Sequence, residues 1–494
     1  MTPETRTARD VQAARHWIDG EWRSSDIVGE SHSPSTGELL GRFADGGATE
    51  AEAAIGAARR AFDTTSWSRD RDGRARALFE LADRLEARRD ALTLMIAREE
   101  GKLLGEAAWE VGASPGMLRH AAAMVLTRSG GRAAEVAPGV YFQSLTEPVG
   151  VAGLIVPWNA PVALLVRSLA PALAAGCTAA VKLPAQTAQV NALFGEVLAA
   201  TNSLPKGVVN IFTETGHDGA AALVASADVD AIGYTGSIRV GRMIAAEAAR
   251  TLKRVNLELG GKTPLIVFED ADLDAALPLL VRSATLMAGH FCMTGSRVLV
   301  HRAIADRVRA WLIPAFERVT VGPSDDPSSE MGPLIDRAHV ARVDRLVEEA
   351  TAAYAKVLVR GGPIADGPLA RGAFYRPTLI EVDDLRAPVI QQEVFGPVQT
   401  FEIFDDEADA IHRANATEHG LAAAVFTRDV NRARRVGREI KAGTVWTNTW
   451  ACMHDQFEEG GFKQSGLGRL RGEHGIAAFE EVKTYVHVAP PAHA

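Results

Sequence analysis

The sequence predicts an α/β protein with at least two domains, on three observations. The chain has 494 residues, more than a single hydrophobic core usually serves. From Val149 onward, short apolar segments alternate with segments whose apolar residues recur at helical spacing. This alternation is typical of a parallel sheet with helices on both faces. A second series of the same kind begins after Glu258 and extends to about residue 465.

The chain before Val149 is predicted to start with a loose tail over residues 1 to about 13, followed by helices. Glu50–Phe62 is rich in alanine and has apolar residues at helical spacing, and residues 74–100 continue that pattern. The arginines of the second segment are expected to form one solvated face: Arg74, Arg76, Arg84, Arg88 and Arg89.

The first α/β series contains four predicted strands, and the residues that follow them are candidates for a ligand site. In parallel sheets, ligands bind beyond the carboxyl ends of the strands. Asn159, Lys182 and Gly236-Ser237 each come just after a predicted strand. The predicted strands are Val151–Val156, Thr178–Val181, Val208–Phe212 and Ala231–Tyr234, and the helices are Ser168–Ala175, Thr187–Thr201 and Asp218–Ala225.

The second series is expected to form its own sheet. Its predicted strands are Pro264–Val267, Val298–Val300, Lys356–Val359, Pro388–Ile390 and Ala423–Phe426. Two further short β-prone segments, Glu135–Glu147 and Val482–Val488, lie outside both series.

Composition narrows the class of protein. The net charge is −9, the isoelectric point is near 5.9 and no cluster of Lys and Arg stands out, so nucleic acid is not an expected partner. The three cysteines, Cys177, Cys292 and Cys452, form neither a disulfide framework nor a metal-ligand spacing, which favours a reducing, cytoplasmic location and predicts no metal site. No membrane association is expected, because the longest apolar run, residues 149–166, is interrupted by prolines and Asn159.

Four short motifs carry side chains with reactive chemistry. A cysteine alone is more often a small buried hydrophobe, and Cys177 and Cys452 keep that interpretation. A thiol and a carboxylate on two loops, however, suit attack on a carbonyl carbon followed by water-driven release. The motifs are Pro157-Trp158-Asn159, Leu257-Glu258-Leu259-Gly260-Gly261-Lys262, Gly289-His290-Phe291-Cys292-Met293 and Glu393-Val394-Phe395-Gly396-Pro397.

Together, and in this order, the four motifs resemble the aldehyde dehydrogenase superfamily over nearly the whole chain. The resemblance implies a Rossmann-like NAD(P)-binding domain over residues 1–127 and 149–258, and an α/β catalytic domain over 259–465. Residues 128–148 and 466–494 would form a small β oligomerisation arm and the C-terminal segment. It also implies NAD or NADP as cofactor, an aldehyde as small-molecule substrate, and a homodimer or homotetramer.

The resemblance assigns the catalytic roles. Cys292 is the implied nucleophile, and the alkoxide formed on attack would be met by the Asn159 side-chain amide and the Cys292 backbone N–H. Glu258 is the implied base that activates water, and Lys182 belongs to the same implied set. His290 stands where the family has Gln or Glu, and its effect on the loop or on the thiol pKa stays open.

The cofactor would lie at the strand ends. Gly236-Ser237-x-x-x-Gly241 follows a strand and is expected to open a helix, whose amides suit a pyrophosphate. The resemblance further implies that Lys182 contacts the adenosine ribose, Glu393 the nicotinamide ribose, and Phe395 the neighbourhood of the nicotinamide. Further expected cofactor contacts are Pro157, Trp158, Leu259 and Gly260.

Ala185 is a departure that bears on the choice between NAD and NADP. The family often has Lys-Pro-x-Glu, whose Glu binds the adenine-ribose hydroxyls, whereas this chain reads Lys182-Leu183-Pro184-Ala185. Without a carboxylate to repel a 2′-phosphate, NADP is expected to be accepted. A shift of the loop by the displaced Pro184 is the alternative.

The expected substrate pocket is mostly apolar, which suits a hydrophobic aldehyde. Members that act on semialdehyde acids, and some that act on aromatic aldehydes, have an arginine at the position of Arg167. Leu286 takes the place of a second arginine of the semialdehyde group and so disfavours that reading. Glu459, where the family usually has Phe, could pair with Arg167, contact a polar substrate group or face solvent. The predicted pocket comprises Ala160, Leu164, Arg167, Leu286, Phe291, Trp450, Met453, Phe457 and Glu459.

The interpretation that follows is a non-acylating NAD(P)-dependent aldehyde dehydrogenase. An acylating relative that hands the thioester to coenzyme A is disfavoured because Glu258 supplies the base that water activation requires. A non-catalytic homologue is disfavoured by the presence of Cys292, Glu258 and Asn159 together.

Overall fold

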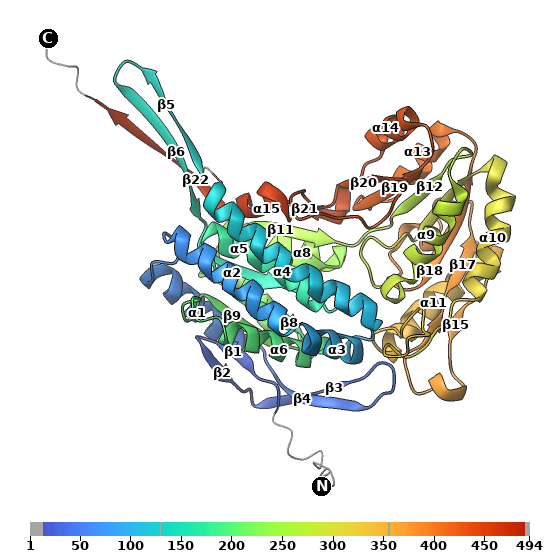
Figure 1. Cartoon of the computed structure of the whole chain (residues 1–494), viewed down its shortest axis with the longest axis horizontal. Coiled ribbons are helices and arrows are strands. Elements are labelled where there is room, and N and C mark those ends of the chain that lie inside the picture. The colour runs from blue at the N-terminus through green and yellow to red at the C-terminus, as the bar shows by residue number, and fades with distance from the viewer. Residues whose placement is uncertain (1–12, 129, 354–355, 490–494) are drawn as a thin grey trace, which may run out of the picture.

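The computed structural model describes residues 13–128, 130–353 and 356–489, and the predicted N-terminal tail falls almost wholly outside them. Two α/β bodies lie side by side, and a thin three-stranded arm projects from the first of them (Figure 1). The first body, blue to green in Figure 1, contains the first predicted series. The second body, yellow to orange, contains the second series.

The first body is built on an eight-stranded sheet in the order β2-β1-β9-β8-β7-β10-β11-β21. Its central strands are parallel, and the fully buried β7 reads as a continuous apolar run because both faces of the sheet are covered. The four predicted strands are confirmed as β7 (Val151–Ile155), β8 (Thr178–Pro184), β9 (Val209–Glu214) and β10 (Ala231–Gly236). A fifth central strand, β11 (Arg254–Leu259), was not predicted. The edges are antiparallel: β1 (His16–Ile18), β2 (Glu21–Arg23) and β21 (Gly466–Leu467). Residues 466–467 therefore extend the first sheet.

Helices pack on both faces of this sheet, as predicted (Figure 1). They are α1 (Ala48–Thr64), α2 (Arg71–Ala87), α3 (Arg89–Glu99), α4 (Leu104–Thr127), α5 (Pro161–Ala175), α6 (Ala188–Ala199), α7 (Asp218–Ala225) and α8 (Ile238–Ala248). The expectation that Arg74 faces solvent is wrong, since its residue is only 6% exposed. Its Nη1 donates to the carbonyls of Trp67 and Ser68 at 3.0 and 2.9 Å. The guanidinium therefore provides hydrogen bonds to two carbonyl groups of the turn before α2.

The second body holds a seven-stranded sheet in the order β14-β17-β18-β13-β12-β19-β20. The strands are β12 (Pro264–Val267), β13 (Arg297–His301), β14 (Lys356–Val359), β17 (Thr378–Glu381), β18 (Val398–Phe404), β19 (Ala422–Phe426) and β20 (Thr444–Thr447). The flanking helices are α9 (Leu273–Thr285), α10 (Ala305–Glu317), α11 (Arg337–Ala353), α13 (Glu407–Asn415) and α14 (Val430–Glu439).

One strand predicted for this sheet is wrong. Pro388–Ile390 lies in the short helix α12 (Pro388–Gln391), where the amides of Ile390 and Gln391 donate to the carbonyl of Ala387. Proline suits the first position of a helix because its missing N–H has no partner there. A three-residue apolar run does not distinguish a buried strand from such a helix.

The arm joins distant parts of the chain. Its strands are β5 (Gly131–Ala137), β6 (Val140–Pro148) and β22 (Glu480–Val488), in the order β22-β6-β5 and all antiparallel. The predicted β-prone segments therefore form one sheet. Many of its apolar side chains are exposed, among them Val136, Val482, Tyr485, Val486 and Val488.

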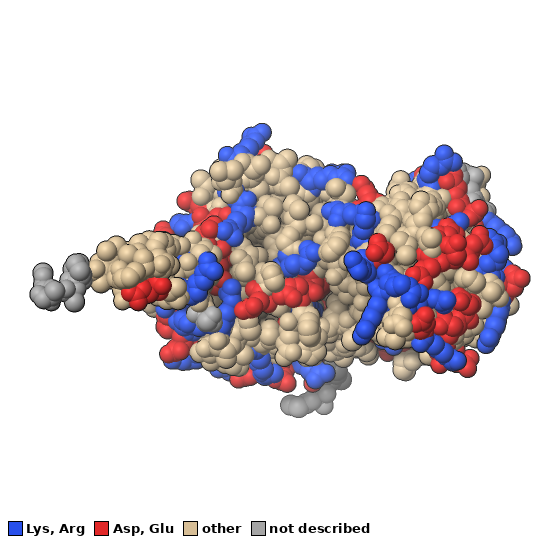
Figure 2. Space-filling view, turned by 90° about the horizontal axis from the view of Figure 1, so that it is seen from above, with Lys and Arg blue, Asp and Glu red and all other residues tan. Residues whose placement is uncertain are grey.

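Surface charge is mixed. On the face shown in Figure 2, Lys and Arg lie among Asp and Glu over most of the surface and do not gather in a stripe. Within the described part of the chain, no helix combines the length and apolarity that crossing a membrane requires. The same residues contain no group of three or more His, Cys, Asp or Glu side chains placed to hold a metal ion.

Candidate active site

Cys292 lies on a tightly folded loop between α9 and β13. Just before it, Met287, Ala288 and Gly289 all have positive φ, at 53°, 51° and 77°. Such a run is strained for residues with a Cβ and persists only where the surroundings hold it. The loop is held by the amide of Met287, which donates to Glu106 Oε1 at 2.8 Å, and by Trp450 Nε1, which donates to the Met293 carbonyl at 2.9 Å.

Two other motifs pack directly against this loop. A Cβ on Gly289 would overlap the backbone of Gly396, and a Cβ on Gly261 would overlap the Cys292 carbonyl. Only glycine allows backbones to approach so closely. The motifs at 257–262 and 393–397 are therefore brought to Cys292, as their resemblance to one site implied.

The thiol of Cys292 is protonated at neutral pH. Its pKa is raised to about 12, mainly by burial and then by the Glu459 carboxylate, while Arg167 opposes the rise. Since the thiolate is the nucleophilic form, attack by Cys292 requires a base to accept its proton.

Asn159 follows β7 and is buried beside the Cys292 loop. Its Nδ2 donates to the carbonyl of His290 at 2.9 Å, which fixes the orientation of the amide. An amide nitrogen carries two hydrogens, so a second one remains to meet a developing oxyanion. His290 itself is buried in an aromatic cluster, at 4.7 Å from the Trp158 ring and 5.5 Å from Phe395 between ring centroids. Burial keeps the pKa of His290 well below its usual value, so this ring is neutral.

Glu258 lies near the end of β11, opposite Thr235 in the parallel register with β10. The pKa of its carboxyl is raised to about 8, mainly by burial, with Arg167 opposing the rise and Glu459 contributing to it. Glu258 Oε1 has no hydrogen-bond partner among the described residues. A carboxyl group with a pKa near neutrality and a free oxygen suits a general base.

Arg167 and Glu459 form a buried ion pair, with side chains 3% and 6% exposed. Arg167 Nη1 donates to Glu459 Oε1, and Nη2 donates to Thr235 Oγ1 at 3.1 Å. The other oxygen of Glu459 accepts from Arg471 Nε at 2.9 Å, and Arg471 also pairs with Asp455. Of the three environments open to Glu459 from the sequence, the structure has the pair with Arg167.

A cavity of about 1270 Å³ reaches Cys292 and Asn159. All but one of the predicted pocket residues line it: Ala160, Leu164, Arg167, Leu286, Phe291, Trp450, Met453 and Glu459. Phe457 is the exception. It is 69% exposed, and a turn in which its amide donates to the His454 carbonyl directs its ring outward, against the ring of His454.

Sequence reasoning missed one wall of the cavity. Glu106, Trp109 and Glu110, on α4, line it together with Lys102. Their spacing of three and four residues places them on one face of a helix, which was the available signal. Lys102 Nζ donates to Glu110 Oε2, whose partner oxygen accepts from the amide of Val162 at 2.9 Å.

The predicted cofactor residues gather at the carboxyl ends of β7, β8, β10 and β11. Ser237 caps α8, with Oγ accepting from the amide of Val240 at 3.4 Å. A Cβ on Gly236 would overlap the Tyr234 hydroxyl, and one on Gly241 would lie 2.7 Å from Leu259 Cδ1. The open first turn of α8 at the sheet edge fits an anionic dinucleotide.

The remaining cofactor candidates lie in three places. A Cβ on Gly260 would overlap the carboxyl of Glu393, which accepts from the Gly261 amide at 3.3 Å. The rings of Trp158 and Phe395 lie 5.7 Å apart. Trp158 directly follows Pro157, just beyond the end of β7. Lys182 lies in β8, and Ala185 opens a short 3₁₀ turn directly after Pro184. Burial lowers the pKa of Lys182, and Glu214 opposes this.

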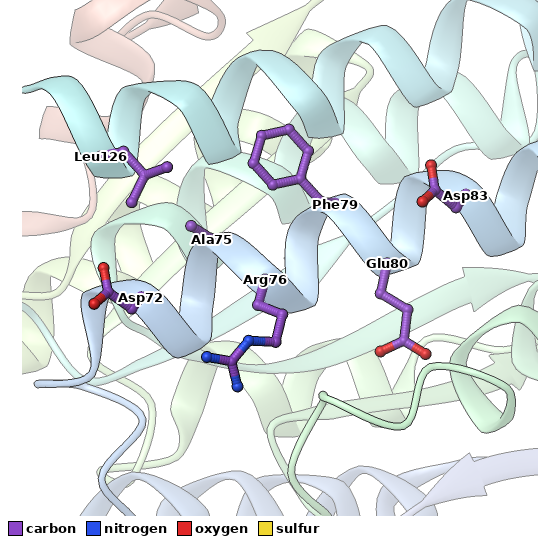
Figure 3. Close-up of a pocket in the computed structure, with 7 residues that line it drawn as sticks. All are labelled: Asp72, Ala75, Arg76, Phe79, Glu80, Asp83 and Leu126. Carbon is purple, nitrogen blue, oxygen red and sulfur yellow. The ribbon is translucent and has the colours of Figure 1, made fainter.

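A second hollow lies on the outer face of α2 and α4 (Figure 3). Phe79 and Leu126 give it an apolar floor, and Asp72, Glu80 and Asp83 surround it. Glu80 is already held by the hydroxyl and amide of Ser203. No thiol or hydroxyl side chain lines this hollow.

Comparison with known proteins gives a consistent result. Residues 22–485 match the model of the aldehyde dehydrogenase family. The chain is 36% identical to an aldehyde dehydrogenase of Enchytraeus buchholzi, over 99% of this chain and 98% of that protein. It is 35% identical to the betaine aldehyde dehydrogenase of Bacillus subtilis, over 96% and 98%.

Solved structures are similar as well. A betaine aldehyde dehydrogenase of Staphylococcus aureus, in complex with NAD+, superimposes with a TM-score of 0.94 at 33% identity. The match covers 97% of each chain.

Proposed function

This chain belongs to the aldehyde dehydrogenase family, and from that membership we propose that Cys292, Glu258 and Asn159 perform its chemistry. The enzyme oxidises an aldehyde to the carboxylate with NAD(P)+ and water, through a cysteine thiohemiacetal and a thioester. The observation that supports the assignment of residues is the convergence on one loop: the motifs of Glu258 and Glu393 pack through glycine against the loop of Cys292.

In the first step, the Cys292 proton passes to a base, and Sγ forms a bond to the aldehyde carbon. The carbonyl π electrons move to oxygen, and the resulting alkoxide accepts hydrogen bonds from the Asn159 side chain and the Cys292 amide. Bound NAD(P)+ supplies the hydride acceptor. Lys182, Glu393 and the first turn of α8 would hold the cofactor.

In the second step, the Glu258 carboxylate takes a proton from water while the water oxygen attacks the thioester carbon. The carbon–sulfur bond breaks, the sulfur takes up the proton held by Glu258 so that the thiol and the Glu258 carboxylate are restored, and the carboxylic acid leaves. The buried Glu258 with its unpaired Oε1 supports hydrolysis over transfer of the acyl group to coenzyme A.

The two sheets and the arm support a division into an NAD(P)-binding domain over residues 1–127 and 149–258, a catalytic domain over 259–465, and an oligomerisation arm and C-terminal segment over 128–148 and 466–494. Ala185 supports acceptance of NADP, since the turn after β8 lacks a carboxylate at this position.

The apolar lining around Leu164, Phe291 and Trp450 supports a hydrophobic aldehyde as substrate.

The arm supports a homodimer or homotetramer, because contact with another subunit would remove its exposed apolar side chains from water. Val486→Asp is expected to reduce the mass measured by light scattering, whereas an unchanged mass would contradict the role of the arm. Free cysteines at 177, 292 and 452 support a cytoplasmic location, which cell fractionation tests.

The decisive experiment follows NAD(P)H absorbance with a panel of aldehydes and both cofactors. Wild-type protein is expected to turn over apolar aldehydes and to release the carboxylate without coenzyme A. Absence of turnover with every aldehyde and both cofactors, or a requirement for coenzyme A, would overturn the proposed function.

A further inference from the structure

Arg167 is a buried cation in the wall of the cavity that reaches Cys292. A guanidinium in such a place ordinarily binds an anionic group, because its planar fork matches a carboxylate. Here the carboxylate is already present, since Glu459 Oε1 accepts from Arg167 Nη1. Both residues line the same cavity, so the pair lies where a substrate would lie.

Glu459 is fixed in this position by two further contacts. Its Oε2 accepts from Arg471 Nε at 2.9 Å, so both carboxylate oxygens are occupied by arginines. Its backbone forms a bridge with Leu470, with N–O distances of 2.8 Å in both directions. Burial disfavours the charged form of Glu459, but Arg167 and Arg471 together lower its pKa, so the group is ionised at neutral pH.

The other cations of the inner cavity are also matched. Arg471 pairs with Asp455 as well as Glu459, and Lys102 lies between Glu110 and Glu100. Arg282 and Arg318 are exposed and share the outer lining with Asp325, Asp326 and Glu330. Among the residues that the structure describes, a carboxylate on a substrate would therefore find no unpaired cation in the inner cavity near Cys292.

We propose that Glu459 is a specificity-determining residue, a built-in carboxylate that reserves Arg167 and restricts the enzyme to aldehydes without a negative charge. The proposal rests on the proposed function, in that Cys292 must first act on an aldehyde in this cavity. An incoming carboxylate would have to compete with one already bound, and it would lie beside the carboxylates of Glu459 and Glu258. In a buried site, such repulsion between like charges is strong.

The test compares two aldehydes of the same chain length, butanal and succinate semialdehyde, which carries a carboxylate at its far end. The ratio of kcat/KM for the anionic over the neutral aldehyde is measured in wild type and in Glu459→Gln. The amide keeps the size of the side chain and gives up the charge, so Arg167 becomes available. The ratio is expected to rise by about 10- to 100-fold, the value of one charge-assisted hydrogen bond.

Glu458→Gln is the matched control. Glu458 carries the same charge one residue earlier, but it contacts exposed His474 and does not line the cavity. Its substitution is expected to leave the ratio at the wild-type value. In the double variant Glu459→Gln and Arg167→Gln, the gain for the anionic aldehyde should disappear, because the cation that would bind it is gone.

Each failure has its own meaning. Wild type that oxidises both aldehydes with similar kcat/KM overturns the inference without any variant, so the test does not depend on folding of Glu459→Gln. An active Glu459→Gln with an unchanged ratio overturns it too, as does an equal rise in Glu458→Gln. In all three cases butanal is still oxidised and the proposed function stands. Loss of activity of wild type towards every aldehyde would instead overturn the proposed function.

Discussion

Thr235 and Glu258 lie opposite each other on the parallel strands β10 and β11, and the Thr235 hydroxyl accepts a hydrogen bond from Arg167 at 3.1 Å. The sheet register therefore sets the guanidinium of Arg167 beside the proposed base. Burial alone would make Glu258 a poor acid, and the nearby Arg167 limits that rise in its pKa. The strand pairing thus tunes the base as well as positioning it.

The activity is expected to rise with pH through the pKa of Glu258. Burial raises this pKa to about 8, and the carboxylate, which is the basic form, predominates above that value. Steady-state kcat should therefore increase from pH 6.5 and level off above about pH 8 if hydrolysis limits turnover. In Glu258→Gln the same titration should be missing from the profile of the residual activity, and its persistence there would assign it to another group.

The same shift affects stability, in the opposite sense. Because the folded-state pKa of Glu258 lies above its ordinary value of 4.5, its contribution is fully present below pH 4.5 and is lost as the pH rises through about 8. The thermal unfolding temperature of Glu258→Gln relative to wild type should consequently increase between pH 5 and 9.

Replacement of the nucleophile should abolish catalysis without abolishing cofactor binding. Cys292→Ala removes the sulfur that forms the covalent intermediate, so NAD(P)H formation should fall to background while titration calorimetry still detects the cofactor. Cys452→Ser is the control, because this exposed residue contacts Trp446 only through its backbone carbonyl. Turnover by Cys292→Ala at a rate comparable to wild type would refute the mechanism.

Glu258→Gln should separate the two halves of the reaction. Attack and hydride transfer remain possible without this base, whereas hydrolysis becomes slow. Stopped-flow absorbance is expected to show a burst of NAD(P)H close to one equivalent per site, followed by slow turnover. If the burst is lost as well, Glu258 acts before hydrolysis, as the base for Cys292.

Ala185→Glu should shift the cofactor preference towards NAD. A carboxylate in the turn after β8 would bind the ribose hydroxyls of NAD and repel the 2′-phosphate of NADP, by roughly 1–3 kcal/mol in total. The measurement is the ratio of kcat/KM for the two cofactors in both proteins. A wild type that accepts only NAD, or a ratio that the substitution leaves unmoved, would mean that Pro184 takes residue 185 away from the ribose.

Gly289→Ala should weaken the Cys292 loop. The added Cβ would require an unfavourable φ of 77° and would overlap Gly396, so both the thermal unfolding temperature and kcat are expected to fall, with a cost of roughly 2 kcal/mol or more. Gly56→Ala is the control. It lies within α1, where the new Cβ would meet only the tip of Arg60 at 3.4 Å, so a small gain in stability is expected. Equal effects of the two substitutions would show that the close approach at Gly289 is unimportant.

The motifs and the buried strands could be predicted from the sequence because their signals are local. Val151–Ile155 is an apolar run typical of a strand covered on both faces, and the helix after Gly236 begins at a capping serine. The side chains that follow these strands share one edge by the geometry of parallel sheets. The gathering of Asn159, Lys182 and Ser237 near that edge was therefore predictable.

Pairings between distant residues were not predictable in the same way. Arg167 and Glu459 are 292 residues apart, and nothing in the local pattern of either shows that the other is its partner. The burial of Arg74 likewise depends on carbonyls in the preceding turn, and the outward ring of Phe457 depends on a turn at His454. In each case the tertiary fold supplies the contact that decides where a side chain points.

The arm has a consequence for the order of events during synthesis. Ser144 of β6 and Thr484 of β22 are hydrogen-bond neighbours, yet 340 residues separate them. At 5–20 residues per second, a ribosome needs roughly 20–70 seconds to make that intervening stretch. Throughout this interval, the edge of β6 that later pairs with β22 has no partner strand. A nascent chain therefore cannot complete its arm until β22 has been made. Association through the arm, as proposed, would therefore begin only after translation of β22, which would keep partly made subunits out of the assembly.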